Sequence, residues 1–413
     1  MDRNLRLLGI GVGLRSFGNA LYFPFLALFL VNQLHVSYVE IGIIITGVGL
    51  VQLPCTLLGG ALADRVERLR LILFGLSAEV AATAGLAYAF SMNSLVLAIT
   101  AAGVGGSLTS LAGPASSAYI ADFAEGPERT RGFTFFRIGF NAGYSAGVTL
   151  GGLLVSDLGF AGSVAVAAIV VAIGATFLAV MLEPSPRDLA ARAHPLPSTT
   201  DPLAARPRSV RESLALLRRD RVALELLVAF FLASLVAGQW GVTFPLFVHN
   251  VLGISYSLLG VGLALNGLVV VFGQTATTES VIGQRHTSVA VWGLGLYVVS
   301  FVGLGLAGLL GALPVVVFFA AVVILTIGEN LITIPQATLP SNIAPKEEIG
   351  SYNGAFSMMA GIGFILSVLL GGVVLSSTAN PVAIWLLLVA PAVPAVVLFR
   401  HASRGLSPTV DRA

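Results

Sequence analysis

Four ionisable side chains fall well inside long apolar stretches of the chain: Arg15, Glu79, Arg137 and Glu329. A charge is costly in an apolar environment, so such groups are normally kept only where they meet a partner, a cavity or a ligand. A carboxyl group in a low-dielectric cavity can also load and release a proton near neutral pH. We therefore look for function first at these four positions.

Both arginines have polar neighbours at helical spacing. Arg15, Asn19 and Tyr22 are spaced i, i+4 and i+7, which places them on one stripe of a helix. Arg137 and Asn141 form a similar i, i+4 pair. Each stripe either lines a cavity, where its arginine would meet an acid or an anion, or contains a fixed internal salt bridge. The spacing fits both interpretations.

Further polar and aromatic residues interrupt the apolar stretches of the second half of the chain. They are Gln239, Trp240, Asn266 and Asn330. Amides and aromatic edges are typical of pockets for amphipathic ligands. The same residue types also link neighbouring helices by hydrogen bonds in a membrane. These four residues are therefore candidates for cavity lining, with helix contacts as the alternative.

The elements that position these residues follow from composition. The chain has 413 residues, of which 56% are hydrophobic and only 10% are charged, whereas a soluble domain has about 25% charged residues. Apolar segments long enough to span the ~30 Å hydrocarbon layer recur along the chain. We expect an all-α integral membrane protein with twelve transmembrane helices, near 7–31, 39–62, 71–91, 95–121, 133–156, 159–182, 222–248, 256–278, 288–309, 313–338, 353–376 and 381–399.

Basic residues set the expected orientation. When the N-terminus is placed in the cytoplasm and the helices alternate, every Lys and Arg except Arg15 and Arg137 falls at the cytoplasmic side. This is the positive-inside pattern. It predicts a multi-pass protein of the cell membrane, with the lipid bilayer as its surroundings and both termini in the cytoplasm.

An internal repeat divides the chain. Asn32, Ser37 and Tyr38 recur as Asn250, Ser255 and Tyr256 at a constant offset of 218 residues. Two pseudo-symmetric six-helix bundles are therefore expected, over residues 1–183 and 222–413. Residues 184–221 are rich in Pro, Ala and Arg, a composition that predicts a flexible cytoplasmic linker.

Glycines recur every four residues in one predicted helix, at Gly139, Gly143, Gly147 and Gly151, followed by Gly152. This spacing puts the first four on one helix face, where small residues let helices approach closely. We expect tight helix packing there.

The most informative motif is a charged cluster between two apolar runs, Gly60-x-Leu62-x-Asp64-Arg65-x-x-Arg68-x-Arg70. It resembles the signature loop between the second and third helices of the major facilitator superfamily of secondary transporters. Glu67 stands where that family usually has glycine. The resemblance implies a cytoplasmic gate that opens and closes, formed by the residues Gly60, Asp64, Arg65, Arg68, Asp122, Arg129 and Arg131.

The resemblance also ranks the buried charges. In this superfamily helices one, four, seven and ten mainly line a central cavity, which favours Arg15 and Glu329, whereas Glu79 falls on a supporting helix. Gly328-Glu329-(x)5-Pro335 is similar to a pattern in facilitator drug exporters, so Glu329 is the candidate for proton coupling. The alternative is a carboxylate that never titrates.

Two departures bear on the resemblance to drug:proton antiporters. The run Gly147 to Gly152 keeps the glycines of an antiporter motif but lacks its proline. The expected fourth helix also lacks the arginine that many proton-coupled members have there. Tight packing alone explains the glycines equally well.

Several function classes are excluded. The chain has no phosphate-binding glycine-rich loop, its five histidines are dispersed, and its net charge is only +2. We therefore expect no enzyme, no cofactor, no metal and no nucleic-acid partner. The expected function is proton-coupled export of small hydrophobic or amphipathic compounds by a monomer, with protons and a small-molecule substrate as its partners. The alternatives are proton-coupled uptake of a sugar or organic anion, and a sensor that does not transport.

Overall fold

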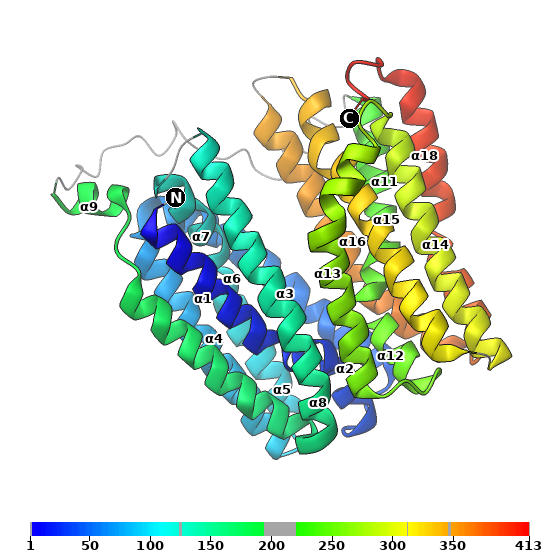
Figure 1. Cartoon of the computed structure of the whole chain (residues 1–413), viewed down its shortest axis with the longest axis horizontal. Helices are drawn as coiled ribbons and strands as arrows, with labels where there is room; N and C mark the ends of the chain where they lie inside the picture. The colour runs from blue at the N-terminus through cyan, green and yellow to red at the C-terminus, as the bar shows by residue number, and fades with distance from the viewer. Residues whose placement is uncertain (1, 124–125, 194–219, 312, 346–347, 413) are drawn as a thin grey trace. The chain divides into compact units, whose positions relative to one another are not determined.

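The computed structural model describes residues 2–123, 126–193, 220–311, 313–345 and 348–412, and their side chains except those of residues 57, 61, 64, 126–130, 191, 193 and 350. The described part is helical apart from turns and an isolated bridge between Arg285 and Arg412. Figure 1 shows the helices coloured along the chain. This is the all-α architecture that the apolar segments predicted.

The helices of the first half are as follows: α1 (Arg3–Ala20), η1 (Phe23–Phe25), α2 (Leu26–Asn32), α3 (Tyr38–Arg65), α4 (Arg68–Ser91), α5 (Leu95–Thr100), the π-helical turn η2 (Ala101–Gly105), α6 (Gly106–Ser110), α7 (Ala112–Phe123), α8 (Gly126–Met181) and α9 (Pro186–Ala193). Those of the second half are α11 (Arg221–Ala237), η3 (Gly238–Trp240), α12 (Thr243–Asn250), α13 (Tyr256–Ser280), α14 (His286–Leu310), α15 (Pro314–Ile343), α16 (Ile349–Ser377), α17 (Pro381–Val389) and α18 (Ala392–Gly405).

Eleven spans within the described residues are long and apolar enough to cross a membrane. One of them, within α8, is 51 residues long, which at 1.5 Å per residue is more than twice the thickness of the hydrocarbon layer. Gly159 interrupts α8 with a φ of 70° and a ψ of 178°. The break falls at the start of the second of the two helices predicted for this region. Counted as two spans, α8 brings the number of spans within the described residues to twelve, as predicted.

The repeat is visible in the backbone. Both halves begin with a helix that breaks, α1–η1–α2 and α11–η3–α12, and both broken helices end at an asparagine of the repeat, Asn32 and Asn250. Left-handed turns follow at His35 (φ 52°) and Gly253 (φ 68°). The side chains then pair reciprocally: Asn32 Nδ2 donates to the Tyr256 hydroxyl at 3.1 Å, and Asn250 Nδ2 donates to the Tyr38 hydroxyl at 3.3 Å. The repeat therefore exchanges contacts between its two copies.

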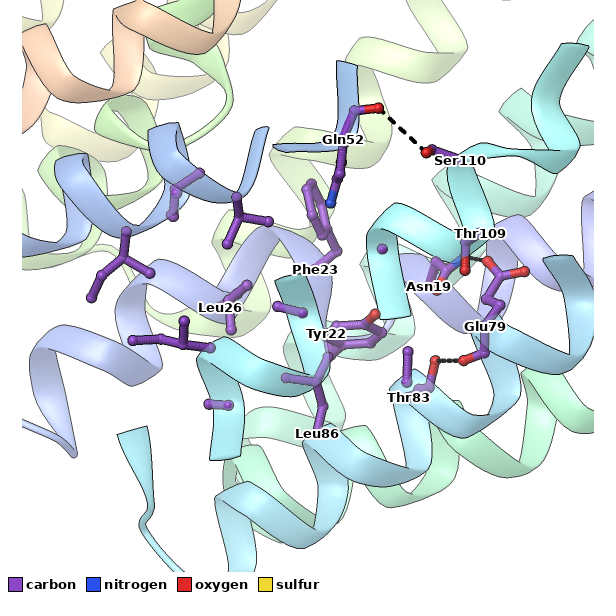
Figure 2. Close-up of a pocket in the computed structure, with 18 of the residues that line it drawn as sticks. Asn19, Tyr22, Phe23, Leu26, Gln52, Glu79, Thr83, Leu86, Thr109 and Ser110 are labelled. Carbon is purple, nitrogen blue, oxygen red and sulfur yellow. Dashed lines mark hydrogen bonds between the residues drawn. The ribbon is translucent and has the colours of Figure 1, made fainter. Parts of the chain in front are cut away.

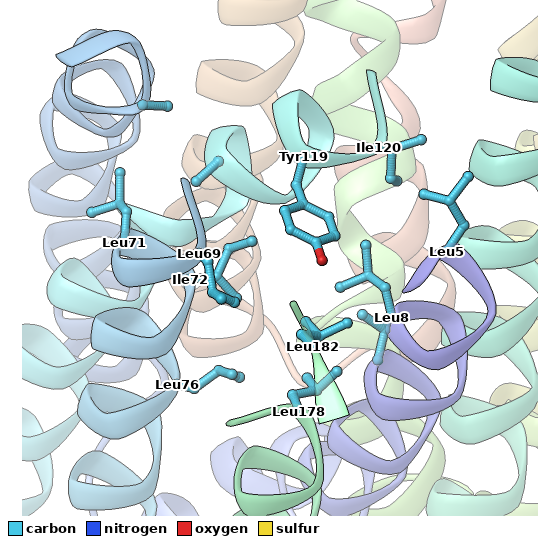
Figure 3. Packing of buried hydrophobic residues seen from close by; sticks show 13 residues of the cluster. Leu5, Leu8, Leu69, Leu71, Ile72, Leu76, Tyr119, Ile120, Leu178 and Leu182 are labelled. Atoms are coloured by element: carbon cyan, nitrogen blue, oxygen red, sulfur yellow. The ribbon is translucent and has the colours of Figure 1, made fainter. Parts of the chain in front are cut away.

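The chain divides into two compact units that reflect this exchange. The first consists of Met1–Val36, Ile44–Thr199 and Ser255–Gly267, and the second of the remaining residues. Each unit thus includes the first turns of a helix from the other half of the sequence. In the first unit, one core lies around Tyr119, whose hydroxyl donates to the backbone oxygen of Glu183 at 2.6 Å. Figure 3 shows the leucines and isoleucines that surround this ring.

The glycine face of α8 packs on α1. A methyl group at Gly139 would overlap the carbonyl oxygen of Gly9, and one at Gly143 would overlap that of Gly13. Such close approach of two backbones requires glycine, because any Cβ would separate the helices. Gly147 and Gly151 approach α1 and the residue after it in the same way. Gly152 faces the backbone of Tyr256 instead.

The second unit has an aromatic core. Phe244 packs with Phe301 and Phe318, and Trp385 stacks on Phe301 with ring centroids 4.5 Å apart. These rings join α12, α14, α15 and α17, and Trp385 is fully buried. The linker differs from expectation in its first part: Pro186–Ala193 forms the helix α9 rather than a flexible segment. Residues 194–219 of that linker lie outside the described part.

Candidate functional site

A cavity of about 400 Å³ lies inside the first unit. Helices α1, α3, α4 and the α5–α7 span all contribute to its walls. Most of the wall is apolar, as at Phe23, Leu26 and Leu86. Polar groups gather at one part of it, and Figure 2 shows Asn19, Tyr22, Glu79 and Thr83 there. A large apolar pocket with a few convergent polar groups is the usual form of a small-molecule site.

A buried ion pair holds the polar part of the cavity together. Arg15 Nε lies 3.1 Å from Glu79 Oε2, and Asn19 Nδ2 donates to Glu79 Oε1 at 2.5 Å. The Glu79 side chain is 8% exposed and that of Arg15 is 29% exposed. Glu79 Oε2 makes no hydrogen bond within the described residues, because its contact with Arg15 is close but poorly aligned. The arginine is therefore the member of the pair that the cavity reaches more easily.

Two helices bring these groups together. On α1, the stripe of Arg15 and Asn19 faces α4, and Tyr22 follows at the point where α1 ends. On α4, Glu79 is one turn before Thr83, whose hydroxyl donates to the Glu79 backbone oxygen at 2.8 Å. Arg15, Asn19 and Tyr22 lie in the wall of this cavity, and Arg15 also forms an internal ion pair, so both interpretations of the stripe have a counterpart in the structure. A role of these residues in substrate binding stays a prediction. Glu79, which the sequence placed on a supporting helix, lines the cavity with them.

An irregular turn packed against α4 contributes to the wall. Ala101–Gly105 forms a π-helical turn between α5 and α6. Such turns are rare and are frequently found at functional sites. Gly106 follows it, and a methyl group there would overlap the Gln52 side chain, which lines the cavity from α3. The sequence showed no sign of this turn, because a π-bulge leaves no residue pattern of its own.

The candidates from the second half of the sequence have different surroundings. Gln239 is fully buried and satisfied: its Nε2 donates to the Leu235 and Ser367 oxygens at 3.0 Å, and its Oε1 accepts from Thr243. It links helices and does not face this cavity. Trp240 packs on Phe244 at 4.5 Å. Asn266 is 8% exposed.

The carboxyl group expected to couple protons lies on α15. Glu329 is half-buried and interacts with other groups of the protein. Its neighbour Asn330 is 1% exposed, and Asn330 Nδ2 has no hydrogen-bond partner among the described residues. Glu329 is not part of the cavity wall described above, which belongs to the first unit.

Comparison with known proteins decides the family. The family described as Major Facilitator Superfamily matches residues 8–368. The chain belongs to this superfamily. Two uncharacterized MFS-type transporters of Bacillus subtilis (strain 168) are relatives: YttB is 27% identical over 90% of this chain and 88% of its own length, and YhjO is 27% identical over 93% and 90%.

Solved structures agree with this assignment at the level of fold. The POT family transporter PepTSo matches with a TM-score of 0.75 and 16% identity, over 98% of both chains. A mutant of the nucleoside transporter NupG matches with a TM-score of 0.74 and 14% identity, over 98% of this chain and all of that one. Relatives and structural neighbours alike are transporters, not enzymes. This facilitator is thus a multi-pass membrane transporter.

The signature loop of this facilitator is built around Arg68 at the start of α4. The Arg68 guanidinium pairs with Asp122 and donates to the Ala118 oxygen at 2.7 Å. Arg68 and Asp122 both belong to the predicted cytoplasmic gate, and the structure pairs these two residues. The side chains of Asp64 and Arg129 lie outside the described part, and Arg65 and Arg131 are exposed. Gly60 has open space around it, whereas neighbouring Gly59 packs on the Leu111 backbone.

Helix α9 accounts for the unusual Glu67 of this loop. Arg192 binds Glu67 through two hydrogen bonds, Nε to Oε1 at 2.9 Å and Nη2 to Oε2 at 2.7 Å. These bonds hold the pKa of Glu67 below its usual range. Asp188 of α9 caps α4 by accepting from the Arg68 and Leu69 backbone N–H groups at 3.1 and 3.4 Å. The family's glycine would lack this carboxylate, so this chain has a docking site for α9 in its place.

Arg137 and Asn141 do not share the cavity with Arg15. Arg137 is exposed on α8 and Asn141 is half-buried, and neither is part of the cavity wall. Among the described residues there is also no group of three or more His, Cys, Asp or Glu side chains that would hold a metal ion.

Proposed function

We propose that this facilitator is a secondary active transporter that exports small hydrophobic or amphipathic compounds by alternating access, in exchange for protons. The observation that supports this proposal is the cavity of the first unit, with its apolar walls and its Arg15–Glu79 ion pair. Such a wall suits an apolar body with one polar group better than a heavily hydroxylated nutrient. The transport unit is a monomer in the cell membrane, with both termini in the cytoplasm.

Three parts of the chain have specific roles in this proposal. Residues 1–183 and 222–413 are the bundles that rock, joined by the linker 184–221. The signature loop, with Asp64, Arg68 and Asp122, is the cytoplasmic gate that breaks and re-forms. Glu329 is the group at which the proton is loaded and released.

Flux in reconstituted vesicles tests the proposal. Naphthalene-2-sulfonate and (2-naphthylmethyl)trimethylammonium are suitable probes, because each has a fixed charge that prevents passive crossing. Transport of a probe opposite to an imposed proton gradient is the expected result, and Glu329→Gln abolishes its dependence on that gradient. Glu225→Gln is the control, since Glu225 pairs with Arg221 and His401 near the N-terminal end of α11. A Glu329→Gln protein with the normal gradient dependence would contradict the role of Glu329.

One observation favours a second function, proton-coupled uptake of an organic anion. Arg15 lines the cavity and is the more exposed charge of its pair with Glu79. The same flux experiment separates the two functions. Proton-coupled uptake moves the probe in the same direction as the protons, whereas export in exchange for protons moves it in the opposite direction.

A further inference from the structure

The wall of the first unit's cavity contains a cationic side chain, Arg15, whose hydrogen-bonding capacity is not fully used. The Arg15 atom nearest to Glu79 is Nε, and neither Nη group donates a hydrogen bond to another described residue. A guanidinium offers its Nη groups as a planar fork that matches a carboxylate, sulfonate or phosphate. Arg15 lines the cavity, and its contact with Glu79 is not a hydrogen bond, so the fork of Nη groups can serve such a ligand.

The carboxylate of the pair is less suited to bind a ligand. Glu79 Oε1 accepts from Asn19, and Oε2 faces the Arg15 guanidinium. A cationic ligand would therefore have to displace Arg15 before it reached Glu79. An anionic ligand would meet the Nη groups of Arg15 without displacing anything.

The walls define the rest of the ligand. Phe23, Leu26, Val48 and Leu86 line the cavity around the polar part. An anionic head at Arg15 would leave the body of the ligand against these side chains. The volume of about 400 Å³ is within the usual range for small-molecule pockets, roughly 300–1,000 Å³.

We infer that the cavity of the first unit binds an amphipathic anion, whose acidic head is held by the Nη groups of Arg15 while Glu79 and Asn19 position that arginine. This inference rests on the proposed transport function and names its substrate class. It assigns Arg15 as a binding residue, and Glu79 and Asn19 as positioning residues.

Matched probes test the charge preference in protein reconstituted in nanodiscs. Naphthalene-2-sulfonate, (2-naphthylmethyl)trimethylammonium and 2-naphthalenemethanol share the naphthalene ring system and differ in charge. We expect the sulfonate to bind most tightly to the unaltered protein, as measured by calorimetric titration. Arg15→Gln should weaken sulfonate binding at least about tenfold, as for the loss of a charged hydrogen bond, and leave the alcohol unchanged. Arg15→Lys should weaken it less, because the charge stays and the fork is lost.

Control variants keep the result decisive. Arg3→Gln is the matched control on α1, since Arg3 forms an exposed pair with Glu183. If Arg15→Gln alone does not fold, Arg15→Gln/Glu79→Gln removes both charges together and should still bind the alcohol but not the sulfonate. Each of three results would overturn the inference. The first is tighter binding of the ammonium than of the sulfonate, and the second is equal sulfonate binding by Arg15→Gln and the unaltered protein. The third is no sulfonate binding to the unaltered protein. Binding of the sulfonate without flux would support the inference and contradict the transport proposal instead.

Discussion

At the scale of single residues, the Arg15–Glu79 pair is the contact on which we expect stability to depend most. Both groups lie within the membrane span of their helices and are mostly buried, so each charge depends on the other. The contact was only half predictable. The spacing of Arg15, Asn19 and Tyr22 defines one helix face, which is local information. The contact of this face with Glu79 depends on which helices pack together, and a local sequence pattern does not show which helices are neighbours.

The pair predicts an unequal effect of single and double substitutions. Arg15→Gln should lower the free energy of unfolding by up to about 3–5 kcal/mol, because it leaves a buried carboxylate without its counter-charge. The double variant Arg15→Gln/Glu79→Gln should lose much less. Apparent melting temperatures in nanodiscs measure the difference, with Arg3→Gln as the variant expected to be unchanged. A double variant less stable than Arg15→Gln would show that the two residues do not form a unit.

At the scale of elements, the α1–α8 contact tests the role of the glycine face. Gly143→Ala should destabilise the protein by about 1–3 kcal/mol or more, since the added methyl overlaps the Gly13 backbone. Gly361→Ala on α16 is the control: that position has open space, so the change should be neutral or stabilising by up to about 1 kcal/mol. Thermal unfolding of both variants measures the contrast. Equal melting temperatures would mean that α1 and α8 do not need this close approach.

Docking of α9 should depend on pH. Because the folded-state pKa of Glu67 is lowered, its bond to Arg192 stabilises docking above the usual carboxyl pKa of about 4.3 and is lost as the pH falls through the lower folded value. Glu67→Gln at neutral pH should reproduce the acid state.

Hydrogen-exchange protection of the amides of residues 186–193 measures this effect. We expect lower protection in Glu67→Gln than in the unaltered protein at pH 7, and a smaller difference in acid. Protection that is the same in both proteins at pH 7 would show that Glu67 does not help to hold α9. Glu67 was recognisable in the sequence as a departure from the family. Its partner Arg192 lies 125 residues further along the chain and could not be predicted from the sequence.

At the scale of the whole molecule, the sequence was most informative. Hydropathy and the distribution of arginines predicted twelve crossings, and the 218-residue repeat predicted two related halves. The structure adds the reciprocal Asn–Tyr bonds between repeat copies. Breaks inside single spans were not predicted, as at η1, η2 and η3, because a span stays apolar whether or not its helix is continuous.

The proposed alternating access requires that the cavity of the first unit opens in turn to the two sides of the membrane. Ser110 lines that cavity, and Cys55 is the chain's single cysteine. Ser110→Cys in a Cys55→Ala background therefore reports access without knowledge of the substrate. Ile169→Cys in the same background is the control, because Ile169 is 62% exposed on the membrane-spanning part of α8 and should face lipid.

A membrane-impermeant maleimide, added separately to each side of sealed vesicles, makes the measurement. We expect the thiol introduced by Ser110→Cys to react from both sides and the thiol introduced by Ile169→Cys to react from neither. Reaction of the Ser110→Cys protein from one side only, or from neither side, would contradict the proposal.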